Sequence, residues 1–265
     1  MVQQDNQPTR KPFVTVPVHD DEDQQELLRG ALVILQKKEG YRFSVDPILL
    51  TAFMEINQGD RVLDLGTGTG VMPIILANRN AAKDAAYTGL EIMETMADMA
   101  RRSVQANRFE NRIQIQLGDI REIKQFMAPD SYDVVISNPP YIPFDAGNVN
   151  PDDLKAIARH EVLVTLPDIV GAARHVLKSR GRAYFVYPVY RLIDLVALCR
   201  EHNLEPRQIQ FVHANQASSA KLVLVEAVRD AGTELKVLRP IIVYNMEGGY
   251  TEEVAEILNE HDTLE

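Results

Sequence analysis

Four consecutive residues near the middle of the chain, Asn138-Pro139-Pro140-Tyr141, have the types needed to act on a planar amino group. Each proline fixes its own φ and holds the preceding residue in an extended conformation, so we expect a rigid segment. The side-chain carbonyl of Asn138 and the backbone carbonyl of Pro139 can accept the two hydrogens of an NH2 group. The Tyr141 ring offers a face for stacking a base, a contact that contributes about 1–3 kcal/mol.

This arrangement suits a nitrogen that is otherwise a poor nucleophile. The lone pair of an exocyclic amino or amide nitrogen is delocalised into the neighbouring π-system. Accepting hydrogen bonds from both N–H groups favours an sp3-like nitrogen and stabilises the positive charge that develops as it attacks. In-line positioning of a good electrophile supplies much of the rest, and the proton can leave afterwards, so no general base is required. We interpret residues 138–141 as the catalytic segment.

A glycine-rich loop, residues 66–70, directly follows the apolar segment 61–65 and precedes a helix-like stretch. Glycines in such a loop let the backbone turn sharply and approach a ligand closely. Asp64, just before the loop, can bind an ammonium group but would repel a pyrophosphate, and the Lys-Ser/Thr pair of a phosphate-binding loop is absent. These features favour an amino-acid-bearing cofactor without phosphate over NAD or ATP. The residues expected to bind it here are Asp64, Gly66, Thr67, Gly68 and Gly70.

Two further acids end the next two strand-like segments. Glu91 is the last residue of the segment 86–91. Its separation from Asp64 along the sequence is close to the spacing at which an acid binds ribose hydroxyls in related nucleotide-binding folds. Asp119 follows residues 113–117 and can accept a hydrogen bond from an adenine amino group. Ligands of open α/β sheets bind outside the carboxyl ends of the strands, so these acids should face one crevice.

The elements that must position these residues alternate regularly. Short apolar runs typical of buried parallel strands are separated by helix-like stretches, which predicts βαβ units with helices on both faces of a parallel sheet. No helix fits between 209–213 and 221–228, so these two segments should pair antiparallel. The other expected strands are 61–65, 86–91, 113–117, 132–137 and 183–187, and the expected helices are 71–79, 94–107, 167–177 and 190–202.

With both motifs in place, the chain resembles the class I N-methyltransferases that carry Asn-Pro-Pro-Tyr, the methyltransferase small domain group. More narrowly, it is similar to the bacterial tRNA1(Val) adenine-37 N6-methyltransferases, over roughly residues 24–260. Four other stretches contribute to the likeness: 41–50, 156–161, 205–213 and 250–254. The resemblance implies an α/β, Rossmann-like fold with a mostly parallel seven-stranded sheet that ends in an antiparallel hairpin.

The same resemblance implies function. It assigns Asp64, Gly66, Gly68, Glu91 and Asp119 to S-adenosyl-L-methionine, whose product is S-adenosyl-L-homocysteine, and residues 138–141 to the target base. The expected reaction is methylation of the N6 amino group of an adenine in RNA, with tRNA as the expected partner.

For three residues outside these motifs, the sequence allows either a role in ligand binding or a purely structural role. Phe43 can pack against the cofactor or the target base, or simply anchor the helix that follows it. Arg159 and His160 can line the substrate entrance, with the arginine on phosphate, or form a helix end with a surface ion pair. We expect a flexible tail over residues 1–23, a methyltransferase domain over 24–230 that includes a helical lid at 24–58, and a C-terminal appendage over 231–265.

Composition narrows the class of protein. The net charge of -10 argues against a surface coated in basic residues, although residues 151–225 are net positive and could contact RNA phosphate. Cys199 is the only cysteine, which excludes an intramolecular disulfide and a zinc ribbon, and the histidines lack metal-ligand spacing. The chain has no apolar run of membrane-spanning length and no apolar signal sequence. We therefore expect a cytoplasmic protein without metal or membrane contact; the oligomeric state stays open, with a monomer as the simplest case.

Other functions fit parts of the pattern. A glutamine side-chain amide also has a planar NH2 group, so a protein glutamine N5-methyltransferase of the release-factor type is an alternative, although such enzymes carry a helical N-terminal recognition domain. Guanine-N2 methylation of rRNA is another, usually coupled to an additional domain. A cofactor-binding RNA scaffold without turnover is the non-enzymatic alternative, and intact Asp64, Asn138 and Tyr141 argue against it.

Overall fold

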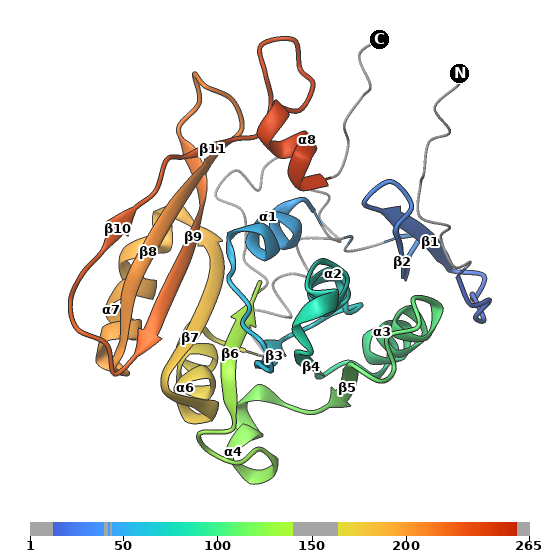
Figure 1. Cartoon of the computed structure of the whole chain (residues 1–265), viewed down its shortest axis with the longest axis horizontal. Coiled ribbons are helices and arrows are strands. Elements are labelled where there is room, and N and C mark those ends of the chain that lie inside the picture. Colours follow the sequence, from blue (N-terminus) through green and yellow to red (C-terminus); the bar gives the residue numbers. More distant parts are fainter. Residues whose placement is uncertain (1–12, 40–41, 43, 140–163, 259–265) are drawn as a thin grey trace.

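The alternating segments between Arg61 and Arg229 build a central sheet with helices on both faces, as the computed structural model shows (Figure 1). The structure describes residues 13–39, 42, 44–139 and 164–258. Its main strands are β3 (Arg61–Leu65), β4 (Ala86–Glu91), β5 (Ile113–Leu117), β6 (Tyr132–Ser137), β7 (Leu177–Pro188), β8 (Leu204–His213) and β9 (Ala220–Arg229).

The strand order confirms the predicted class I methyltransferase sheet. The path is β10-β8-β9-β7-β6-β3-β4-β5, in which β5, β4, β3, β6 and β7 are parallel and β9 lies antiparallel between β7 and β8. Two short strands, β10 (Lys236–Val237) and β11 (Ile241–Ile242), pair with β8 and bring the sheet to nine strands in the described part of the chain. The carboxyl ends of β3, β4 and β6 lie next to one another, which places the loops that follow them together.

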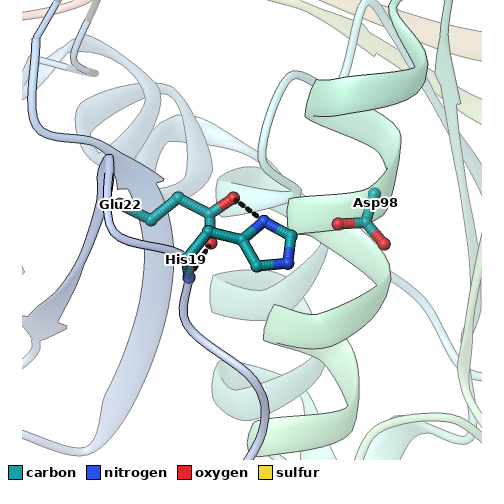
Figure 2. A group of neighbouring side chains, drawn as sticks. All are labelled: His19, Glu22 and Asp98. Atoms are coloured by element: carbon teal, nitrogen blue, oxygen red, sulfur yellow. Dashed lines mark hydrogen bonds and ion pairs between the residues drawn. The ribbon is translucent and has the colours of Figure 1, made fainter.

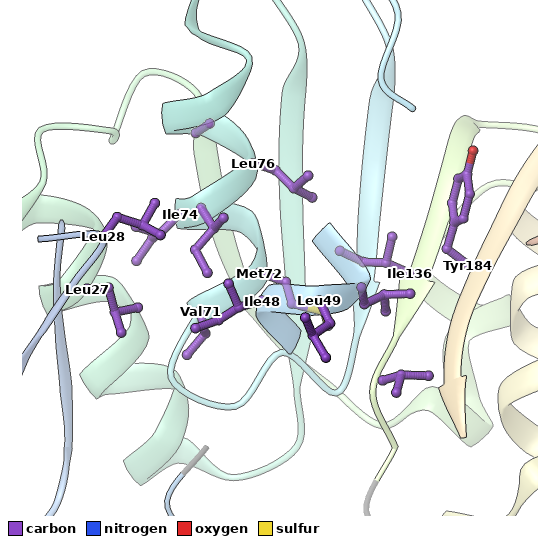
Figure 3. Close-up of a cluster of buried hydrophobic side chains, with 14 of the residues drawn as sticks. Leu27, Leu28, Ile48, Leu49, Val71, Met72, Ile74, Leu76, Ile136 and Tyr184 are labelled. Carbon is purple, nitrogen blue, oxygen red and sulfur yellow. The ribbon is translucent and has the colours of Figure 1, made fainter. Parts of the chain in front are cut away.

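Alternate residues of each central strand enter different cores, because helices cover both faces. Val62 and Ile136 pack with the helices of one face, whereas Leu63 and Val135 pack with those of the other. Figure 3 shows part of the first core, in which side chains of α1 and α2 pack onto the sheet. The helices are α1 (Asp46–Phe53), α2 (Val71–Arg79), α3 (Glu94–Ala106), α4 (Ile123–Phe126), α6 (Leu166–Val176), α7 (Leu192–Glu201) and α8 (Glu252–Leu258), with short 3-10 turns at η1 (Ala81–Lys83), η2 (Ile120–Glu122) and η4 (Val189–Arg191).

The N-terminal region differs from the helical lid predicted over residues 24–58. It begins with an antiparallel hairpin, β1 (Glu22–Leu27) and β2 (Leu32–Lys37), and its one helix is α1. The turn uses positive φ at Leu28, Arg29 and Gly30 (49°, 54° and 68°). The predicted tail over 1–23 is also too long at its end, because Val16 is buried and the Val14 N–H donates to the Ala106 carbonyl (3.0 Å).

The reason for the hairpin lies in α3, far away in the sequence. The free edge of β2 donates its Val33 N–H to Asn107 Oδ1 (3.0 Å) and its Leu35 N–H to Ser103 Oγ (2.9 Å). Polar helix side chains thus satisfy backbone donors that would otherwise be left unpaired at a strand edge. Figure 1 shows the hairpin beside α3, at the opposite end of the molecule from β8 and β10.

The C-terminal segment folds back over the first helical layer. The chain turns at residues 245–249, where the Asn245 N–H donates to the Gly249 carbonyl (2.8 Å), and α8 then packs against α1. Arg79 of α2 donates to the Ile257 carbonyl of α8, which ties this segment to the main domain. Within the described residues, no helix combines the length and the apolar character needed to cross a membrane.

Candidate active site

A pocket lies at the carboxyl ends of the central strands, where the sequence motifs predicted it. Its walls come from the glycine loop, the end of β4 and the residues after β6, and also from β2, α1, α3 and the start of α6. The lining residues are Gln36, Lys37, Pro47, Leu65, Gly66, Thr67, Gly68, Thr69, Val71, Met72, Leu90, Glu91, Ile92, Met93, Met96, Ile120, Asn138, Pro139, Val164 and Ile169.

The glycine loop owes its shape to backbone conformations that other residues seldom adopt. Gly66, Gly68 and Gly70 have φ values of 78°, 57° and 82°. Gly66 and Thr67 both donate their N–H groups to the Leu90 carbonyl (2.9 and 3.0 Å), which fixes the loop to the end of β4. Gly66, Thr67 and Gly68 line the pocket as predicted, whereas Gly70 caps α2 and packs against Ala100 behind it.

Asp64 carries the most unusual electrostatics of the site. Its side chain is fully buried, and Oδ2 accepts a hydrogen bond from Thr67 Oγ1 (2.7 Å). Its other oxygen, Oδ1, is buried without a hydrogen-bond partner in the described part of the chain. Burial raises the pKa of Asp64 to about 7, and the nearby Glu91 charge adds to this rise while the Thr67 hydrogen bond opposes it. Asp64 does not itself belong to the pocket lining, whereas its neighbours Leu65 and Gly66 do, so its role toward the ammonium group of the cofactor stays a prediction.

Gly89, which the sequence analysis did not single out, makes this arrangement possible. A Cβ on Gly89 would lie 2.7 Å from Thr67 Cγ2, 2.8 Å from Thr67 Oγ1 and 2.9 Å from Ile115 Cδ1. The missing side chain therefore leaves the space that Thr67 occupies next to Asp64. The signal was a glycine inside a strand, which often marks a close approach by another group.

Glu91 lines the pocket and is already oriented by the backbone. One carboxylate oxygen accepts from the Gly68 N–H and the other from the Met93 N–H, each at 2.9 Å. A carboxylate oxygen has more than one acceptor direction, so both remain able to accept from ribose hydroxyls. The predicted cofactor role is compatible with this geometry.

Asp119, the third predicted acid, already has a partner on its own segment. Its carboxylate caps η2 by accepting from the Arg121 N–H (2.9 Å) and also pairs with the Arg121 guanidinium. The Arg121 hydrogen bond lowers the pKa of Asp119. Asp119 does not belong to the pocket lining, although its neighbour Ile120 does. The structure therefore does not bring this third acid to the site with a free carboxylate.

Asn138 and Pro139 line the same pocket as the glycine loop residues. The buried hydroxyl of Ser137 donates to the Leu65 carbonyl (2.9 Å). This bond joins the end of β6 to the end of β3, directly before the glycine loop and Asn138 begin. The separation between the catalytic segment and the cofactor loop is therefore set by one hydrogen bond and the sheet itself. Pro140, Tyr141, Phe43, Arg159 and His160 lie outside the described residues, so their assignments stay predictions.

The hairpin supplies pocket residues that the sequence analysis missed. Gln36 and Lys37, at the end of β2, both line the pocket. Lys37 Nζ pairs with Asp21 Oδ2 (2.6 Å), and Gln36 is buried. Only the tertiary placement of the hairpin reveals them, since the segment was predicted to be helical.

A second cluster holds the hairpin against α3. His19, Glu22 and Asp98 come close enough for their ligand atoms to lie within 4.8 Å of one another (Figure 2). Both carboxylates are already paired with the guanidinium of Arg102, however. Arg102 donates to Glu22 Oε1 and Oε2 (2.9 and 2.7 Å) and to Asp98 Oδ2 (2.6 Å). The Arg102 hydrogen bond lowers the pKa of the buried Glu22 to about 2. We interpret this cluster as a structural ion-pair network.

Comparison with known proteins agrees with this geometry. Residues 56–256 match the family model described as a methyltransferase domain. Two relatives are named tRNA1(Val) (adenine(37)-N6)-methyltransferase. The one from Porphyromonas gingivalis is 30% identical over 70% of this chain and 73% of its own length. The one from Bacteroides thetaiotaomicron is 27% identical over 83% and 90%.

Among solved structures, a predicted O-methyltransferase from Agrobacterium tumefaciens shares the fold, with a TM-score of 0.66, 22% identity, and coverage of 81% of this chain and 96% of that one. A SAM-dependent methyltransferase from Aquifex aeolicus aligns with a TM-score of 0.51 at 13% identity over 69% and 89% of the two chains. The sheet order, the pocket at its carboxyl edge and the family match lead to one conclusion: this chain belongs to the class I S-adenosylmethionine-dependent methyltransferases.

Proposed function

We propose that this enzyme transfers the methyl group of S-adenosyl-L-methionine to the exocyclic N6 of an adenine in RNA, with tRNA as the substrate. The observation that carries the proposal is the position of Asn138 and Pro139, which lie in the wall of the same pocket as Gly66, Gly68 and Glu91. This shared lining supports a site in which carbonyl acceptors for an NH2 group lie next to the methyl donor.

The chain's own residues divide the work between the two ligands. Asp64 is proposed to accept from the ammonium group and Glu91 from the ribose hydroxyls, while the loop backbone closes against the ligand. When bound, the cofactor supplies an electrophilic methyl group. The Asn138 side-chain carbonyl and the Pro139 backbone carbonyl accept from the two hydrogens of the target amino group, which increases the nucleophilicity of its nitrogen. Tyr141 is proposed to stack on the base, which fixes the nitrogen in line with the methyl group.

The choice of RNA rests on a different support. The relatives named above carry names that specify adenine 37 of a tRNA, and the match extends over most of this chain. Arg159 and His160 are proposed to contact the RNA at the substrate entrance. We also propose that the enzyme works in the cytoplasm, without a metal ion.

The decisive experiment measures methyl transfer from labelled S-adenosylmethionine to unmodified tRNA, followed by nucleoside digestion and mass spectrometry. The proposal expects N6-methyladenosine with the wild type and none with Asn138→Ala, while both proteins bind S-adenosylhomocysteine with similar affinity. Parallel reactions contain rRNA and a release factor, which offer guanine and glutamine nitrogens. Methylation of either of these, with none in tRNA, would refute the adenine assignment while leaving the enzyme class intact.

A further inference from the structure

The end of strand β2 carries a buried acceptor without a hydrogen-bond partner among the described residues. Gln36 is only 3% exposed, and its side-chain carbonyl oxygen Oε1 is buried with no hydrogen-bond partner in the described part of the protein. The residue lines the cofactor pocket. An unsatisfied buried acceptor costs about 1–3 kcal/mol, and most buried polar groups in native proteins have partners. A donor that arrives with the ligand would remove this cost.

The packing of β2 on α3 indicates which part of the ligand Gln36 meets. The contacts move toward the start of the helix as β2 proceeds, from Val33 opposite Asn107 to Leu35 opposite Ser103. Gln36 comes next, and it shares the pocket with Met96 in the first turn of α3. The residues that precede this turn include Glu91, the proposed ribose ligand. Gln36 therefore lies on the nucleoside side of the pocket.

We propose that Gln36 is a cofactor-positioning residue whose side-chain carbonyl accepts a hydrogen bond from the nucleoside half of S-adenosylmethionine. The donors available there are the ribose hydroxyls and the adenine amino group. Gln36 and Glu91 then hold the nucleoside from two different elements, the hairpin and the end of β4. This inference concerns cofactor binding alone and does not depend on which nucleic acid or protein is methylated.

Hydrogen bonds to α3 fix the position of the hairpin that carries Gln36. Its anchor is the Arg102 guanidinium, which contacts both Glu22 oxygens and the Pro17 carbonyl (2.8 Å). A rigid acceptor loses little conformational entropy when the ligand binds, so the hydrogen bond contributes more to affinity than one from a mobile loop.

The test compares Gln36→Met with the wild type, because methionine has a similar length and no amide. Isothermal titration calorimetry should show S-adenosylhomocysteine bound about 3- to 10-fold more weakly by the variant, the range expected for one neutral hydrogen bond. Binding of 5′-methylthioadenosine, which lacks the amino-acid half, should weaken by the same factor. The ligand-free melting temperature should stay the same or rise, because the variant removes an unpaired buried acceptor.

The matched control is Gln24→Met, which changes an exposed glutamine on the other strand of the same hairpin and should leave both affinities unchanged. Unchanged S-adenosylhomocysteine affinity in Gln36→Met would overturn the inference, and a lower ligand-free melting temperature with unchanged affinity would make the residue structural. Weakening restricted to S-adenosylhomocysteine would overturn the nucleoside assignment. None of these measurements contains RNA, so failure here is distinct from failure of the proposed substrate.

Discussion

If Asp64 binds the ammonium group as proposed, one residue affects both the stability of the ligand-free protein and its affinity for the cofactor. Its carboxylate is fully buried, has one oxygen without a partner among the described residues, and has a pKa raised by burial from 3.8 to about 7. Asp64→Asn keeps an oxygen that can accept from Thr67 but can never become charged. We expect this variant to be more stable than the wild type without ligand at pH 8, and to bind S-adenosylhomocysteine much more weakly.

The sign follows from the two states of the protein. Above pH 3.8 the unfolded chain loses the Asp64 proton, whereas the folded protein retains it up to about pH 7. The unfolded state is therefore favoured as pH rises through this window, and the penalty is complete above pH 7 and absent below 3.8. Each pKa unit corresponds to about 1.36 kcal/mol, and the folded-state group is half ionised at pH 7, so the advantage of Asp64→Asn should grow by about 2.3 kcal/mol between pH 5 and pH 7.

Urea unfolding of both proteins at pH 5, 6, 7 and 8 measures this difference in stability. The contributions of all other titratable groups cancel in the difference because both proteins share those groups. Calorimetric binding of S-adenosylhomocysteine over the same range should show wild-type affinity rising toward pH 7, since the ammonium requires an ionised partner, and a flat, weaker profile for the variant. Two parallel stability curves would refute the burial argument. Equal affinities at pH 8 would refute the pairing of Asp64 with the ammonium group.

Three other substitutions test separate parts of the site. Gly89→Ala places a methyl group within 2.8 Å of Thr67 atoms. We therefore expect urea unfolding to show a loss of about 1–3 kcal/mol in the free energy of unfolding, and calorimetry to show weaker cofactor binding. Wild-type values in both experiments would show that the strand can shift to accommodate the methyl group. Arg102→Leu leaves Glu22 charged and buried, which should cost about 3–5 kcal/mol in urea unfolding at pH 7, and a loss below 1 kcal/mol would contradict the ion-pair interpretation. Asn138→Ala should reduce the rate of methyl transfer at least a hundredfold with unchanged S-adenosylhomocysteine affinity, because it removes an acceptor used in the reaction and not in cofactor binding.

The sheet could be predicted from the sequence because its signals are local. A parallel strand covered on both faces is largely apolar, and short apolar runs such as residues 134–136 are typical of such strands. The structure gives β6 the predicted bounds, Tyr132–Ser137, and β3, β4 and β5 also match. The signal for the antiparallel strand pair is also local in the sequence, because seven residues between the two expected strands leave no room for a crossover helix.

The hairpin could not be predicted in the same way. The apolar run at residues 32–35 suits a strand or a buried helix, and the deciding contacts are made by Ser103 and Asn107, about seventy positions later. Periodicity within one segment carries no information about such partners. Gln36 was missed for the same reason, since its place in the pocket depends on how β2 lies along α3.

The three acids at the strand ends show what spacing can and cannot establish. Spacing brings each carboxylate to the same edge of the sheet, but the nearest donor then decides whether it remains available. Glu91 is held by backbone N–H groups that leave further acceptor directions, and Asp64 keeps one oxygen entirely unpaired. Asp119 is occupied by Arg121, two residues along the chain. The Arg121 hydrogen bonds leave a carboxylate with further acceptor directions, as for Glu91, so the role of Asp119 toward the adenine amino group stays a prediction.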